Sequence, residues 1–221
     1  MKTNIDIQPL VEVVKKLRSP NGCPWDKVQT HESLRRYFIE ETYEVVDAID
    51  NKDMDNLREE LGDVLLQIVF HSSIAEENGA FTLQDVINDV TEKMIHRHPN
   101  VFPEENPDNK GKTYTWDELK AQEKGNIRKS VLDGVSKGLP ALVAAQKLQD
   151  KAGKVGFDWD ELDPIWAKVN EEIGEFKEAV ALKDRENMEK EAGDVLFSLI
   201  NLFRWYKISG ENALNRTNTK F

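Results

Sequence analysis

The sequence has little cysteine and histidine. Its 221 residues include one cysteine, Cys23, and four histidines. A single cysteine cannot form a disulfide within the chain, and this usage is typical of proteins from a reducing compartment. No histidine follows a glutamate by three residues, so the sequence lacks the Glu-x-x-His ligand pattern of di-iron helical bundles. These shortages exclude a disulfide scaffold and disfavour a histidine-based metal centre.

The chain also lacks long apolar runs and an excess of positive charge. No stretch reaches the roughly 20 apolar residues that span a bilayer, and the first residues lack the apolar core of a secretion signal. Lysine and arginine number 30 against 41 aspartates and glutamates, for a formal net charge of −11. Because nucleic-acid backbones are bound by basic surfaces, we expect no polymeric nucleic acid as partner. The sequence therefore predicts a soluble, cytoplasmic protein that does not bind membranes.

Two short acidic motifs stand close together in the second half of the chain. They comprise Glu171, Glu172 and Glu175, followed by Glu191 and Asp194. Residues three and four apart share one face of a helix, so each motif places its carboxylates together. A charged turn at residues 183–185 would make the two segments an antiparallel helical hairpin. Such a hairpin brings four carboxylates face to face: Glu172, Glu175, Glu191 and Asp194.

Acidic helical segments are often only solvated surfaces, and that reading has to be weighed against a metal site. Asp194 is followed by a nearly continuous apolar run, residues 195–203, which is typical of a buried helix. An unpaired carboxylate at the edge of a core is costly. A hard divalent cation such as Mg²⁺ prefers oxygen ligands and would neutralise the cluster.

The same acidic pattern occurs earlier in the chain, displaced by 131 residues in both motifs (171 − 40 and 191 − 60). The earlier copy consists of Glu40, Glu41, Glu44, Glu60 and Asp63. Acidic residues that are merely solvated have no reason to recur at the same spacing in both halves of the chain. The repeat therefore favours two related helical units.

Three flanking segments accompany the two copies: Gly22-Cys23-Pro24-Trp25-Asp26, Arg97-His98-Pro99-Asn100-Val101-Phe102 and Val155-Gly156-Phe157-Asp158-Trp159. With the tandem acidic motifs, they make the whole chain closely resemble the MazG family of nucleoside triphosphate pyrophosphohydrolases. This resemblance implies an all-α fold of two tandem MazG-like helical-bundle repeats. It also implies Mg²⁺-dependent cleavage between the α and β phosphates, giving a nucleoside monophosphate and pyrophosphate, and usually a homodimer.

We expect the first repeat to occupy residues 1–102 and the second residues 139–221. Residues 103–138, rich in Pro, Asn, Gly and charge, would form a polar linker carrying a polar helix from Thr115 to about Arg128. Relatives of this family usually continue with a basic segment and a further helix. The second repeat is therefore expected to be cut short at its C-terminus.

Residues at helix starts give more local expectations. Asp53 is expected to cap the helix that begins at about Met54. Thr82 and Asp85 resemble a capping arrangement for the next helix. Asp163 and Pro164 are expected to supply the cap and the first turn of the helix that carries Glu171 to Glu175.

Several polar residues are candidates for binding substrate. Lys147, Lys151 and Lys154 form one stripe of a helix, which would face a triphosphate or would simply be solvated. Asn201 and Arg204 continue the helical face of Asp194, whereas the first copy has Phe70 and Ser73 in the same register. Asn can read a base or ribose edge, and Arg can hold phosphate. Lys220, which aligns with Lys93 of the first copy, completes the set.

We therefore expect the second copy to be the main catalytic site and the first to provide a dimer or scaffold surface. Mg²⁺, or alternatively Mn²⁺, would be held by Glu172, Glu175, Glu191 and Asp194, and the corresponding acids of the first copy, Glu41, Glu44, Glu60 and Asp63, are candidates for a second metal site. Glu171, Glu172 and Glu175 are the catalytic candidates, and Glu171 or Glu172 would take the proton of the attacking water.

The expected activity serves nucleotide clearance, including non-standard triphosphates, with no preference of base or sugar fixed by the sequence. A competing interpretation is a non-catalytic helical module that binds metal or nucleotide, or that docks a partner protein. Release of pyrophosphate from a triphosphate would separate these two interpretations.

Overall fold

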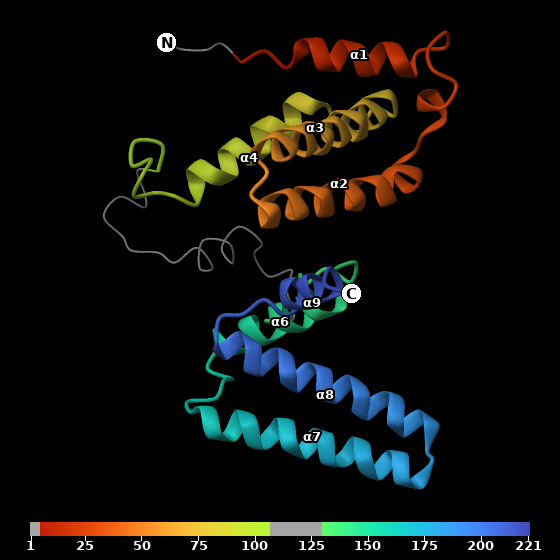
Figure 1. The fold of residues 1–221 in the computed structure, drawn as a ribbon. Coiled ribbons are helices and arrows are strands. Elements are labelled where there is room, and N and C mark those ends of the chain that lie inside the picture. Colours follow the sequence, from red (N-terminus) through yellow and green to blue (C-terminus); the bar gives the residue numbers. More distant parts are fainter. Residues whose placement is uncertain (1–4, 107–129) are drawn as a thin grey trace. The chain divides into compact units, whose positions relative to one another are not determined.

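The computed structural model describes residues 5–106 and 130–221, and every regular element in these ranges is a helix (Figure 1). This confirms the all-α prediction. The elements are α1 (Gln8–Arg18), the short 3-10 helix η1 (Asp26–Val28), α2 (His31–Asn51), α3 (Met54–Glu77), α4 (Leu83–His96), α6 (Ala141–Gly153), α7 (Leu162–Leu182), α8 (Arg185–Trp205) and α9 (Gly210–Asn218). None of these described helices is long and apolar enough to cross a membrane.

The tandem repeat predicted from the acidic motifs is present in the helix boundaries. Helices α7 and α8 begin 131 residues after α2 and α3, respectively (162 − 31 and 185 − 54). Both hairpins turn in the same way: Lys52 and Lys183 each adopt a left-handed conformation with φ 57°, and Asp53 and Asp184 each cap the following helix. The same local signal thus folds two similar antiparallel helix pairs.

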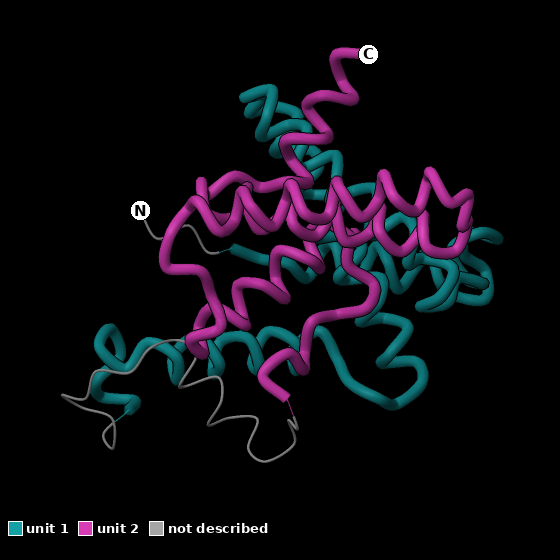
Figure 2. Tube along the Cα trace, turned by 90° about the horizontal axis from the view of Figure 1, so that it is seen from below, with its two compact units in different colours: residues 1–120 teal, residues 121–221 magenta. Residues whose placement is uncertain are grey.

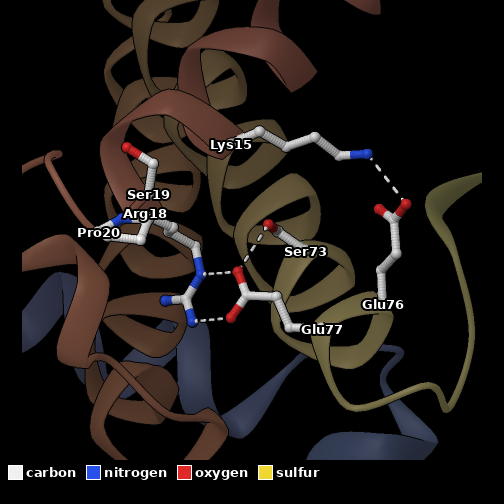
Figure 3. Close-up of a pocket in the computed structure, with 7 residues that line it drawn as sticks. All are labelled: Lys15, Arg18, Ser19, Pro20, Ser73, Glu76 and Glu77. Carbon is white, nitrogen blue, oxygen red and sulfur yellow. Dashed lines mark hydrogen bonds and ion pairs between the residues drawn. The ribbon is translucent and has the colours of Figure 1, made fainter.

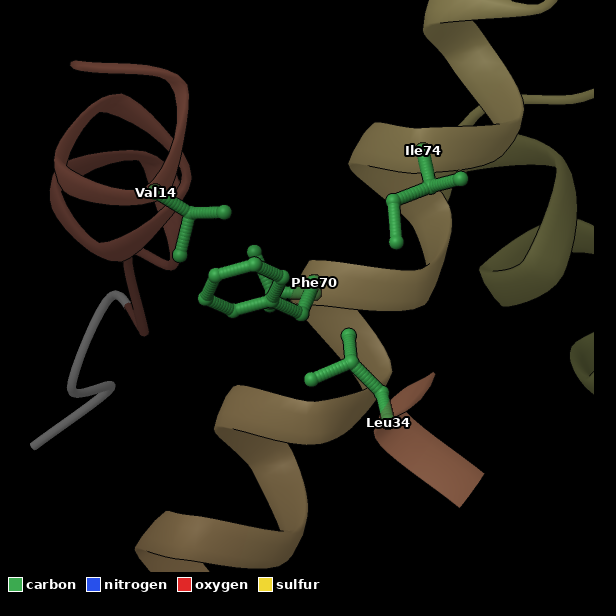
Figure 4. Close-up of a cluster of buried hydrophobic side chains, with 5 residues drawn as sticks. Val14, Leu34, Phe70 and Ile74 are labelled. Carbon is green, nitrogen blue, oxygen red and sulfur yellow. The ribbon is translucent and has the colours of Figure 1, made fainter. Parts of the chain in front are cut away.

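Each helix pair is covered by a shorter preceding helix. In the first unit α2 packs along α3, and α1 and α4 lie against α3; in the second α7 packs along α8, and α6 lies against α8. The first core contains Val14 from α1, Leu34 from α2, and Val69, Phe70 and Ile74 from α3 (Figure 4). A third helix is needed because a two-helix hairpin alone leaves one apolar stripe in water.

The second unit has a smaller apolar core, formed by Ile165 and Val169 of α7 and Leu202 of α8. Helix α9 begins close to α8, since a Cβ atom at Gly210 would lie 2.3 Å from Cδ1 of Ile200. Leaving out the side chain at residue 210 therefore allows the close approach of these two helices.

Two of the three predicted helix caps are confirmed. The Asp53 carboxylate accepts hydrogen bonds from the backbone N–H groups of Asp55 and Asn56, and Thr82 forms a reciprocal capping box with Asp85. The prediction of a cap at Asp163 is wrong. Helix α7 begins at Leu162, and its N-cap residue is Glu161, whose side chain makes no capping hydrogen bond. Leu162 packs against the second core, and this burial draws the chain into the helix two residues earlier than predicted.

The chain divides into two compact units, residues 1–120 and 121–221 (Figure 2). This division falls within the predicted linker at 103–138. The finer boundaries at 102/103 and 138/139 stay a prediction, and the predicted polar helix at residues 115–128 lies outside the described residues.

Candidate active site

Three of the predicted metal ligands come together between α7 and α8. Glu172 and Glu175 lie one turn apart on α7 and face Glu191 of α8, and one carboxylate oxygen of each lies within 4.8 Å of the others. Glu172 and Glu191 are buried, whereas Glu175 is exposed. The helical spacing and the tight turn at Lys183 therefore bring carboxylates from two segments into one cluster, here called the second acidic cluster.

The carboxylates of the second acidic cluster repel one another because their negative charges lie close together. The pKa of Glu175 is raised above its usual value, first by partial loss of hydration and then by repulsion from Glu172 and Glu191. A cation that relieves this repulsion would stabilise the ionised form of all three groups.

Two lysines that the sequence analysis did not single out balance part of this charge. Lys168 Nζ lies 2.8 Å from Glu171 and 2.7 Å from Glu172, and Lys190 Nζ lies 2.9 Å from Glu191 and 3.8 Å from Asp194. These acids raise the pKa of both lysines, with Glu171 the largest cause at Lys168 and Glu191 at Lys190. The i,i+4 spacing of Lys168 and Glu172 was the signal that could have revealed the first pair.

One carboxylate oxygen at the centre of the cluster remains without a partner. Glu191 is 5 % exposed, and its Oε2 atom has no hydrogen-bond partner among the described residues. A buried carboxylate oxygen in that state is costly unless a cation binds to it. The donor set, all carboxylate oxygen, is the type that Mg²⁺ and Mn²⁺ accept. The residues present therefore fit a hard divalent cation.

A cavity of about 650 Å³ opens beside the second acidic cluster. Its wall has a polar part, which includes Lys168, Glu172 and Asp194, and an aromatic part, which includes Phe157, Trp159 and Phe197. The remaining lining residues are Leu132, Leu148, Gln149, Ala152, Gly156, Asp158, Ser198, Asn201 and Arg204. A cavity that combines charge with flat apolar surface suits a ligand that has both a charged and an aromatic end.

Asn201 and Arg204 line this cavity as the helical register predicted, but Arg204 is already bound by protein groups. Its Nη1 atom donates to Asp158 Oδ2 at 2.9 Å, its Nη2 atom donates to Asp158 Oδ1, and its Nε and Nη2 atoms donate to Asn201 Oδ1. Arg204 is the largest cause that lowers the pKa of Asp158. The guanidinium thus holds the loop at residues 155–159 against α8.

The remaining predicted substrate residues are not among the residues that line the cavity. Helix α6 contributes Leu148, Gln149 and Ala152 to the wall, which is a different face from the stripe of Lys147, Lys151 and Lys154. Lys151 donates instead to the backbone carbonyls of Val131 and Asp133, at 3.1 and 2.7 Å. Lys220 is exposed at the end of the chain. A phosphate-binding role for these four lysines stays a prediction.

The first copy also brings acids from its two helices together, but through a different set of positions and without the two lysines. Glu41, Glu60 and Asp63 place ligand atoms within 4.8 Å of one another, and Glu44 raises the pKa values of Glu41 and Glu60 after loss of hydration, the largest cause. Tyr37 and Glu59 stand in the registers of Lys168 and Lys190 (168 − 131 and 190 − 131). The two clusters therefore differ in one carboxylate position, Asp63 in the first and Glu175 in the second, and in the residues at the registers of the two lysines.

The regular elements of the described residues are all helices, and buried carboxylates meet beside a cavity with a partly aromatic wall. This arrangement fits an enzyme whose chemistry depends on carboxylates. The model of the MazG nucleotide pyrophosphohydrolase domain matches residues 29–102 and 162–221, which include both helix pairs. The chain belongs to this family, and it is an enzyme of the pyrophosphohydrolase class. The resemblance inferred from the sequence is thereby confirmed.

Individual relatives extend this match to the whole chain. The chain is 48% identical over 221 residues to a protein of Thermotoga maritima named nucleoside triphosphate pyrophosphohydrolase/pyrophosphatase MazG, covering 100% of this chain and 84% of that protein. It is 42% identical over 220 residues to a nucleoside triphosphate pyrophosphohydrolase of Escherichia coli, covering 97% and 84%. It is also 51% identical to the uncharacterized protein YabN of Bacillus subtilis, covering 95% of this chain and 43% of that protein.

Proposed function

We propose that this protein hydrolyses nucleoside triphosphates between the α and β phosphates, releasing a nucleoside monophosphate and pyrophosphate. The relatives named for this activity support the substrate class. The observation that carries the proposal is the convergence of Glu172, Glu175 and Glu191 beside the cavity, with the buried Glu191 Oε2 atom unpartnered within the described structure.

We assign the metal to the second acidic cluster. Glu172, Glu175 and Glu191, with Asp194 at the edge, would hold Mg²⁺ or Mn²⁺. When bound, the ion would neutralise phosphate charge and polarise a water molecule. The cation pair around the cluster, Lys168 and Lys190, adds positive charge where the triphosphate would approach.

The proton of the attacking water has two candidate acceptors, Glu171 and Glu172. Both carboxylates lie within 2.8 Å of the same Lys168 Nζ atom, which holds the two side chains close together, and a positioned carboxylate can act as a general base. Glu171 is the more exposed of the two, with 55% of its side chain accessible against 9% for Glu172. Glu175 completes the catalytic set by sharing the cluster with Glu172.

We assign the main activity to the second copy and a scaffold or dimer role to the first. The second copy combines its acidic cluster with the lysine pair and with a cavity that Asn201 and Arg204 help to line. The first copy, with Glu41, Glu44, Glu60 and Asp63, keeps the acids but has Phe70 and Ser73 where the second has those two polar residues.

A panel of triphosphates tests the reaction. The purified chain is incubated with the standard ribonucleoside and deoxyribonucleoside triphosphates and with inosine triphosphate, with Mg²⁺, with Mn²⁺ and with a chelator, and the products are separated by chromatography. Monophosphate and pyrophosphate are expected with either metal and not with the chelator. A role in clearing non-standard nucleotides predicts that inosine triphosphate is cut at least as fast as the standard ones. Tight nucleotide binding without any cleavage would instead support the non-catalytic module.

We also propose that the protein is a homodimer. Large apolar side chains remain exposed on the long helix pairs of both units, among them Leu61 and Leu65 of α3 and Trp166 and Leu196 of the second pair, with 52, 38, 45 and 53% exposure. Large apolar side chains exposed on these helix pairs would be covered in a dimer, and such surface marks an interface where it is contiguous. Sedimentation equilibrium should give twice the chain mass of 25.4 kDa, and a monomer at micromolar concentration would contradict the proposal.

A further inference from the structure

Gln149 is a buried amide in the cavity wall, and only the nitrogen of its side-chain amide makes a hydrogen bond within the described residues. It lies on α6, is 8 % exposed, and its Nε2 atom donates to the backbone carbonyl of Phe197 on α8 at 2.8 Å. Its Oε1 atom has no hydrogen-bond partner in the part of the chain that the structure describes. Leaving a buried acceptor in that state costs free energy, so its position needs an explanation.

The orientation of this amide follows from its one hydrogen bond. Turning the group over would place Oε1 against the Phe197 carbonyl oxygen, and two acceptors repel. The α6–α8 contact therefore uses one N–H of Nε2 and leaves the Oε1 atom as an acceptor without a partner in the wall of the cavity.

The surroundings of Gln149 fit the aromatic end of a nucleotide. Phe157 and Trp159 lie in the same wall, and aromatic side chains stack on bases, while Leu148 adds apolar surface beside them. Along α8 the wall runs from Asp194, at the acidic cluster, through Phe197 to Asn201. Seven residues of helix span about 10 Å, which is the length scale that separates the phosphates of a nucleotide from its base.

The first copy carries no such acceptor in this register. Arg18 stands 131 residues before Gln149 (149 − 18), and an arginine side chain only donates. Its Nε and Nη2 atoms bind the Glu77 carboxylate, both at 2.7 Å (Figure 3). Its Nη1 atom donates to the backbone carbonyl of Asp26 at 2.8 Å. In this register the first copy thus has an arginine that makes a structural contact, whereas the second has an amide in the cavity wall with an unpartnered acceptor among the described residues.

We propose that the cavity is the nucleobase subsite and that Gln149 Oε1 accepts a hydrogen bond from an N–H group on the pairing edge of the base. This inference rests on the proposed function. Adenine and cytosine offer an amino group, and guanine, uracil, thymine and hypoxanthine offer a ring N–H. A single acceptor therefore admits many bases and disfavours a base without any donor on that edge.

Purine riboside triphosphate provides the test, because it is adenosine triphosphate without the amino group. The ratio of kcat/KM for the two substrates is measured for the wild type, for Gln149→Met and for Gln146→Met. Gln146 is the matched control, since it lies on the same helix and is not among the cavity-lining residues. The wild type should prefer adenosine triphosphate by about 10-fold or more, because the analogue leaves the acceptor unpaired.

The Gln149→Met variant should lower this ratio to about 1, and Gln146→Met should keep the wild-type ratio. Partial misfolding does not change the ratio, because both substrates meet the same active fraction. A wild-type ratio near 1, or an unchanged ratio in Gln149→Met, would overturn the base-reading role. If no triphosphate is cleaved at all, the proposed function fails. The dissociation constants of the same two nucleotides, measured by calorimetry with the same three proteins, then decide the subsite by the same ratio.

Discussion

Replacing Glu191 by glutamine should lower kcat by about 100-fold or more, because several kcal/mol of charge stabilisation depend on a carboxylate at this place. Glutamine keeps the size of the side chain, so packing between α7 and α8 is preserved. It removes the negative charge from a residue that is 5 % exposed and whose Oε2 atom is unpartnered within the described structure. Pyrophosphate release at saturating Mg²⁺ and adenosine triphosphate measures the effect.

The matched control is Glu60→Gln, the same change in the same register of the first copy (191 − 131). It should leave kcat within about threefold of the wild type if the second copy is the main site, since this corresponds to less than 1 kcal/mol. The pair Glu175→Ala and Glu44→Ala should behave in the same way. Loss of turnover in Glu44→Ala with normal turnover in Glu175→Ala would reverse the assignment of the two copies.

A second readout separates metal binding from a general loss of structure. Mg²⁺ should raise the melting temperature of the wild type, because a ligand that binds only the folded state stabilises it. The Glu191→Gln variant should melt normally without metal and should lose most of the Mg²⁺-dependent increase. A variant that melts much earlier than the wild type in chelator would show damage to the fold and not to the metal site.

Replacing Arg204 by methionine should raise KM by about tenfold with a smaller change in kcat. Arg204 binds both oxygens of Asp158 and the side-chain oxygen of Asn201, and its side chain is 15% exposed. Hydrogen bonds to charged groups contribute roughly 1.5–3 kcal/mol, and partial exposure reduces this to about 1–1.5 kcal/mol here. Without the guanidinium, the cavity-lining loop at residues 155–159 is less well held, and substrate binding should weaken.

The variant Asp158→Asn distinguishes a positioning role from direct phosphate binding. If Arg204 only holds the loop, Asp158→Asn should raise KM as Arg204→Met does, and the double variant should add little. If Arg204 binds phosphate, freeing it from Asp158 should lower KM. Arg18→Met is the control, because Arg18 binds Glu77 in a similar bidentate pair of the first unit and should affect stability without changing KM.

The same pair predicts a pH effect on stability. Arg204 lowers the pKa of Asp158 in the folded state below its unfolded value of about 3.9. The stabilisation is therefore present above the unfolded pKa and is lost as the pH falls through the folded pKa. Wild type and Arg204→Met should differ in melting temperature at pH 6 and converge as the pH is lowered toward 2. A constant difference over this range would mean that the effect of Arg204 is packing and not charge.

The sequence was enough to predict the helices and the pairing of the acids. A spacing of three residues places Glu172 beside Glu175 on any helix, and the charged turn before Arg185 predicts the hairpin that adds Glu191. These are local properties, so the same pattern produced the same hairpin twice. The start of α7 was misjudged because burial of Leu162, a tertiary contact, outweighed the capping preference of Asp163.

The surroundings of the acids were decided only by tertiary structure. The sequence placed Arg204 on the correct face but could not show that Asp158, 46 residues away, binds it. The contact between Gln149 and Phe197 likewise joins residues 48 positions apart, and such pairing is set by the packing of α6 on α8. Sequence by itself thus determined which residue types lie on each helical face, since that depends on spacing alone. Which of those residues meet in the cavity depended on the packing of helices distant in the chain.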